Sequence, residues 1–87
     1  MAHHIRKRFP EKKHRIDRLM ANDPEFLILC EDYDICVNAL EYWANSKLPE
    51  AEIRVNEYRN IADGLEEEIV EALRAMKPKD LDLILPK

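Results

Sequence analysis

Glycine is nearly absent from this sequence, which has one glycine in 87 residues. Tight turns between strands and loops that hold nucleotide phosphates both depend on glycine, because other residues adopt those backbone conformations only under strain. No candidate nucleophile stands beside a general base in a recognisable catalytic pattern either. We therefore expect neither a β-rich fold nor an enzyme, and no cofactor.

Long apolar runs are also lacking, since none approaches the roughly 18 residues that a membrane-spanning helix needs. No signal segment precedes a small-residue cleavage site. The two cysteines, Cys30 and Cys36, are separated by roughly 9 Å along a helix, which is too far for a disulfide between them. We interpret both as small apolar core residues in a reducing compartment, and we expect a soluble cytoplasmic protein without membrane contact.

Charge and heptad-spaced apolar residues are abundant. Charged residues make up 37% of the chain, which suits long exposed helices. Two apolar series alternate steps of three and four residues, the period of helices that pack lengthwise on a partner. The first series is Phe26, Leu29, Tyr33, Cys36, Leu40 and Trp43, and the second is Ala51, Val55, Tyr58, Ala62, Leu65, Ile69, Ala72 and Met76. They predict helices over 24–45 and 49–77, and the short break between them favours an antiparallel hairpin.

The segments outside the hairpin complete a single all-α domain over 1–87. A short extra helix is predicted over 10–21, with Pro10 in its first turn and Ile16 and Leu19 on its apolar side. Asp23 can cap the next helix, because Pro24 suits the position that follows a cap. Residues 1–9 are predicted to form a polar basic arm. Residues 78–87 form a Leu-rich tail with a period near two, which could be a short strand docked on a neighbour or could be disordered.

The helix predicted over 24–45 has more apolar residues than one hairpin can bury. Between Phe26 and Ala44, 14 of 19 residues are apolar, and the heptad series uses only six of them. Either the short first helix or a second protomer must cover the surplus. We expect a homo-oligomeric, coiled-coil-like bundle that could also bind another protein. The residues predicted to mediate self-association are Leu27, Ile28, Ile35 and Tyr42, together with Leu81, Leu83 and Leu85 of the tail.

Charge is distributed unevenly along the chain. Residues 1–18 hold seven basic and two acidic residues, a net of +5, so the remaining 69 residues carry −9 of the total −4. Such an arm could bind an anion such as a nucleic acid, or the acidic surface of a second copy. The residues of this candidate anion-binding arm are Arg6, Lys7, Arg8, Lys12, Lys13 and Arg15. The acidic remainder and the lack of a helix-turn-helix or zinc pattern disfavour a nucleic-acid partner.

Two patterns could in principle bind a metal, although we predict no metal site of biological function. Glu11 and His14 have the spacing of di-iron helix bundles, but both are expected on a solvated face. After removal of Met1, the amine of Ala2, the amides of His3 and His4 and the imidazole of His4 could enclose Cu(II) or Ni(II) in a square plane.

An ordered set of residues between positions 9 and 74 resembles a known family. The set is Phe9-Pro10-Glu11, Ile16-x-x-Leu19, Pro24-x-Phe26-x-x-Leu29, Tyr33, and Leu65-Glu66-Glu67-Glu68-Ile69. It is similar to the YdcH-like family of small bacterial proteins. The resemblance implies a short helical hairpin that forms coiled coils, and it supplies no catalytic or ligand-binding residues. The basic arm and the Leu-rich tail have no counterpart in the family pattern.

Overall fold

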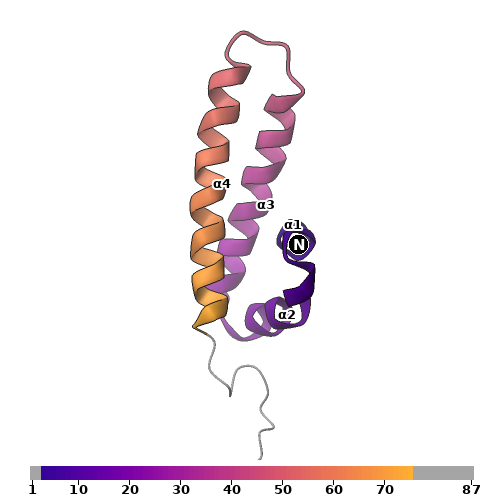
Figure 1. Cartoon of the computed structure of the whole chain (residues 1–87), viewed down its shortest axis with the longest axis vertical. Helices are drawn as coiled ribbons and strands as arrows, with labels where there is room; N and C mark the ends of the chain where they lie inside the picture. Colours follow the sequence, from indigo (N-terminus) through magenta and orange to yellow (C-terminus); the bar gives the residue numbers. More distant parts are fainter. Residues whose placement is uncertain (1–2, 76–87) are drawn as a thin grey trace, which may run out of the picture.

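The part of the chain that this computed structural model describes, residues 3–75, consists of helices and their connections (Figure 1). The elements are α1 (His3–Arg8), the 3-10 helix η1 (Pro10–Lys12), α2 (Lys13–Asn22), α3 (Pro24–Ala44) and α4 (Ala51–Arg74). Within these residues there is no strand, which confirms the prediction of an all-helical chain.

The two long helices, α3 and α4, run antiparallel and pack along their length, as Figure 1 shows. The heptad series predicted this contact, since most buried side chains between the helices belong to it. The buried residues of the pair are Phe26, Cys30, Tyr33 and Cys36 from α3, and Ala51, Ala62, Ile69 and Leu73 from α4. Each helix thus contributes both large and small side chains to the core, a mixture that permits close packing.

The start of α3 is fixed by a cap that the sequence predicted. The side chain of Asp23 accepts hydrogen bonds from the backbone N–H groups of Glu25, at 3.0 Å, and Phe26, at 3.3 Å. Pro24 occupies the first turn, where its missing N–H leaves no donor unpaired. The cap turns the chain sharply, so α2 lies across the end of the hairpin, where it buries Ile16 and Leu19.

The N-terminal segment differs from the predicted polar arm over 1–9. His3–Arg8 forms α1, and its Ile5 side chain is completely buried in the core. The backbone N–H of His4 donates to Asp34 Oδ1 of α3 at 3.1 Å, and His4 Nε2 lies 2.9 Å from the side-chain oxygen of Asn38. A single apolar residue between histidines and basic residues produces no periodic signal, so the sequence does not reveal this contact.

The ends of the hairpin helices differ slightly from the prediction. The helix predicted over 24–45 ends at Ala44, and the helix predicted over 49–77 spans Ala51–Arg74. Local turns, rather than the apolar period, determine where a helix begins and ends, and residues 48–50 form such a turn before α4. The Leu-rich tail, and with it the alternatives of a docked strand or disorder, lies outside the described residues. No helix within residues 3–75 combines the length and apolar character that crossing a bilayer requires.

Candidate interaction surfaces

Three exposed apolar side chains form a line along α3. Ile28, Ile35 and Tyr42, which we call the outer row, are 56%, 66% and 62% exposed. Residues seven apart lie almost directly above one another on a helix, so the row follows the helix axis for roughly 21 Å. The sequence predicted more apolar residues on this helix than one hairpin can bury, and these three are left exposed by α1, α2 and α4.

The short helix α1 covers a different strip of α3 from the outer row. It contacts Asp34 and Asn38, and Cys30, one turn before Asp34 on the same strip, is completely buried although it lies outside the heptad series. Leu27, which we predicted to join the outer row in self-association, is half-buried. The short helix predicted over 10–21, which is α2 in the structure, also leaves the outer row exposed, so the alternative in which that helix covers the surplus is wrong.

The polar residues that flank the outer row are arranged unequally along it. Glu31 and Asp32 lie between Ile28 and Ile35, and both are exposed. No ion pair joins these two carboxylates to a basic side chain within residues 3–75, and α3 itself has no lysine or arginine. Between Ile35 and Tyr42 the flanking residues are instead the neutral pair Asn38 and Ala39. The acidic half of this face is therefore the N-terminal half.

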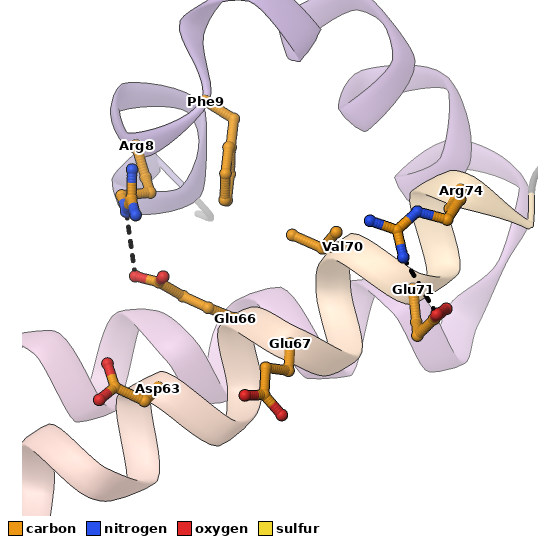
Figure 2. A pocket seen from close by; sticks show the side chains of 8 residues that line it. All are labelled: Arg8, Phe9, Asp63, Glu66, Glu67, Val70, Glu71 and Arg74. Carbon is orange, nitrogen blue, oxygen red and sulfur yellow. Dashed lines mark hydrogen bonds and ion pairs between the residues drawn. The ribbon is translucent and has the colours of Figure 1, made fainter.

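A second surface feature is an open cleft between the end of α1 and the outer side of α4 (Figure 2). Its volume is about 620 Å³, and Phe9 and Val70 provide its apolar lining. The charged residues that line it are Arg8, Asp63, Glu66, Glu67, Glu71 and Arg74. Both arginines are engaged, since Arg8 Nε donates to Glu66 Oε2 and Arg74 Nη1 donates to Glu71 Oε2, each at 3.2 Å. The cleft is therefore acidic.

Glu66 connects this cleft to the core. The hydroxyl of the buried Tyr33 donates to Glu66 Oε2 at 2.5 Å, so the same oxygen accepts from both Tyr33 and Arg8. Burial, followed by the hydrogen bond to the carboxylate, raises the pKa of Tyr33 well above its usual range. The phenol is thus a neutral donor that helps hold α1, α3 and α4 together.

Both cysteines are buried and free, in line with their interpretation as core residues. Burial first, and then the negative charge of Asp34, raises the pKa of the Cys30 thiol from 9.0 to about 12. Burial also raises the pKa of Cys36, whose Sγ donates to the backbone oxygen of Tyr58. Thiols that stay protonated at neutral pH are poor nucleophiles.

The residues of the candidate anion-binding arm are divided by the structure. Arg6 pairs with Asp17 at 2.6 Å, and Arg8 pairs with Glu66. Lys7, Lys13 and Arg15 are exposed and Lys12 is half-buried, and these four make no ion pair or side-chain hydrogen bond within residues 3–75. Lys13 and Arg15 are two residues apart on α2, which turns them about 200° from each other, so they do not share one face.

The remaining predicted sites are placed as follows. Glu11 and His14 are both exposed, and residues 3–75 contain no group of three or more His, Cys, Asp or Glu side chains that could hold a metal ion. Of the terminal copper pattern, Ala2 lies outside the described residues, while the amide and imidazole of His4 contact α3. Leu81, Leu83 and Leu85 also lie outside the described residues. Ile53 and Ile61 are exposed on α4. The sequence did not predict them as surface apolar residues, because neither belongs to the heptad series.

No protein-family model, curated protein or solved structure matches this chain. The resemblance to YdcH-like proteins therefore stays a prediction from the sequence.

Proposed function

We propose that this chain is a small protein-interaction module that self-associates through the outer row of α3. The observation that carries the proposal is the exposure of Ile28, Ile35 and Tyr42 in one line along a helix. Single exposed apolar residues are common on protein surfaces, but exposed apolar side chains aligned along one helix with a polar border are typical of a binding face. Its heptad spacing is the spacing with which one helix packs lengthwise on another.

The internal contacts of the N-terminal segment support an apolar interface over an electrostatic one. Arg6 and Arg8 form ion pairs with Asp17 and Glu66 of their own chain. Exchange of a basic arm between two protomers would first have to break these pairs. Association through the outer row needs no such rearrangement, so we expect it to depend little on salt.

The family resemblance and the absence of an evident catalytic constellation favour the same proposal. YdcH-like proteins are helical hairpins expected to form coiled coils, so a scaffolding role in which the hairpin holds proteins together fits the similarity. The outer row could also accept a helix of another protein, and a second copy is the partner for which the chain itself supplies the matching surface.

Light scattering on a size-exclusion column tests the proposal directly. At low and high salt we expect a mass of twice the monomer or more. Ile35→Glu should reduce the mass to that of a monomer, because it places a carboxylate at the centre of the apolar contact.

Ile53→Glu is the matched control, since Ile53 is 60% exposed on α4 and lies away from the outer row. It should leave the mass unchanged, and both variants should retain wild-type helical circular dichroism. A wild-type monomer at both salt concentrations, or an Ile35→Glu variant that keeps the oligomeric mass, would contradict the proposal.

A further inference from the structure

The outer row is symmetric about its middle residue. Ile28 and Tyr42 each lie seven residues from Ile35, so a two-fold axis through Ile35 maps the row of one copy onto the row of another. In an antiparallel pair of α3 helices, Ile35 would meet Ile35 of the second copy. Ile28 would meet Tyr42 of the second copy, so every residue of the outer row would have an apolar partner.

The flanking residues distinguish this arrangement from a parallel one. In such a pair, residues at equivalent heptad positions share one flank of the contact, so Glu31 lies beside Asn38 of the second copy, and Asp32 lies beside Ala39 of the second copy. A parallel pair would instead place Glu31 and Asp32 beside the same carboxylates of the second copy, without a basic residue on α3 to compensate them. Like charges in contact disfavour the parallel pair, whereas amide–carboxylate contacts suit the antiparallel one.

The orientation of Asn38 provides an independent indication. Its side-chain oxygen lies 2.9 Å from His4 Nε2 of α1 and accepts a hydrogen bond from it. This bond engages the oxygen of the amide, whereas the Nδ2 group of the exposed Asn38 makes no hydrogen bond within residues 3–75. An N–H donor at this position is what the carboxylate of Glu31 of a second copy would require.

Two further features favour close approach of antiparallel helices. Ala39 has a small side chain, which lets the backbone of a second helix come near, and the ring of Tyr42 is supported by Trp43 in an edge-to-face contact at 5.1 Å. The helix dipoles of an antiparallel pair also oppose each other favourably.

We propose that two copies of this chain associate through an antiparallel α3–α3 contact with its two-fold axis at Ile35. This inference rests on the self-association proposed above and specifies its partner surface and register. The contact places the acidic half of each outer face against the neutral half of the other.

Cysteine crosslinking in the full-length chain tests the register. With a short bismaleimide, Ile35→Cys should crosslink to a covalent dimer, because the two positions meet at the axis. Ile28→Cys alone should not, because the two copies of position 28 lie roughly 21 Å apart along the helix direction. An equal mixture of Ile28→Cys and Tyr42→Cys should give the covalent heterodimer.

The wild-type chain is the first control, since Cys30 and Cys36 are buried and should give no product. Ile53→Cys, at a similarly exposed position on α4, measures crosslinking by random collision. Crosslinking of Ile28→Cys with itself, or failure of Ile35→Cys to exceed Ile53→Cys while light scattering still shows an oligomer, would overturn the register and leave self-association standing. A monomer by light scattering would overturn both.

Discussion

At the scale of single residues, one carboxylate oxygen links three helices. Glu66 Oε2 accepts hydrogen bonds from Tyr33 of α3 and Arg8 of α1, and Glu66 itself belongs to α4. Hydrogen bonds to a charged acceptor are stronger than those between neutral groups, more so where one partner is buried. The heptad pattern predicted that Tyr33 would face α4, but a pattern of apolar positions carries no information about where its hydroxyl finds an acceptor.

Stability should fall as the pH rises above about 9, and Tyr33 and Cys30 are the physical reason. Burial raises the pKa of both groups in the folded chain, that of Cys30 from 9.0 to about 12 and that of Tyr33 from 10.0 to beyond its usual range. The unfolded chain therefore releases these protons at lower pH than the folded chain does. The contribution of both groups is complete below pH 9 and is lost progressively above it. Urea unfolding at a series of pH values measures this decline.

The variant Tyr33→Phe measures how much of this loss of stability at alkaline pH comes from the Tyr33 phenol. At pH 7 the variant should lose about 1.5 kcal/mol of unfolding free energy, because it removes a hydrogen bond to a charged acceptor. Its decline above pH 10 should be shallower than that of the wild type, because phenylalanine has no proton to release. Tyr58→Phe is the control, since the Tyr58 hydroxyl makes no hydrogen bond within the described residues 3–75, so this variant should change neither value. Equal alkaline declines in all three proteins would refute the assignment to Tyr33.

At the scale of elements, the sequence predicts the helices that have a repeated apolar signal and misses the one that does not. The apolar series over 26–76 is long enough to identify α3 and α4, and Asp23-Pro24 identifies the start of α3. The helix α1 depends on a single apolar side chain, that of Ile5, and on polar contacts to Asp34 and Asn38 that only the folded arrangement creates. Which strip of α3 it covers could therefore not be predicted.

Ile5→Ala should release α1 from α3. The removed side chain is completely buried, and isoleucine-to-alanine changes at such sites typically cost about 2–5 kcal/mol. Because a six-residue helix is unstable alone, most of this loss should appear as local opening of α1. Opening uncovers Cys30, so the rate of thiol alkylation under native conditions should rise by an order of magnitude or more.

Ile53→Ala is the matched control for this experiment, because it removes the same atoms from an exposed position on α4. It should leave both the alkylation rate and the unfolding free energy nearly unchanged. An unchanged alkylation rate in Ile5→Ala would show that α1 does not protect Cys30.

At the scale of the whole molecule, charge segregation is partly neutralised within the chain. Arg8 pairs with Glu66 of the acidic remainder, whereas Arg6 pairs with Asp17 within the N-terminal segment itself. The four basic residues of the predicted arm that make no such contact within residues 3–75 do not all share a face, since Lys13 and Arg15 point apart. Nucleic-acid binding by this arm would need several phosphate contacts along one surface.

We therefore expect weak binding to nucleic acid at most. In a gel mobility assay with duplex DNA or RNA, any shift at low salt should disappear by about 150 mM salt, because a few phosphate contacts are lost steeply as counterions compete. The net charge of −4 acts in the same direction by repelling the phosphate backbone.

Glu66→Gln is the informative variant, since it removes the negative charge opposite Arg8. If Arg8 contacts phosphate, this variant should bind more tightly at low salt than the wild type, whereas Glu57→Gln, at the exposed i,i+3 pair with Arg54, should not. A wild-type shift that persists at physiological salt would instead identify the N-terminal segment as a binding site for nucleic acid.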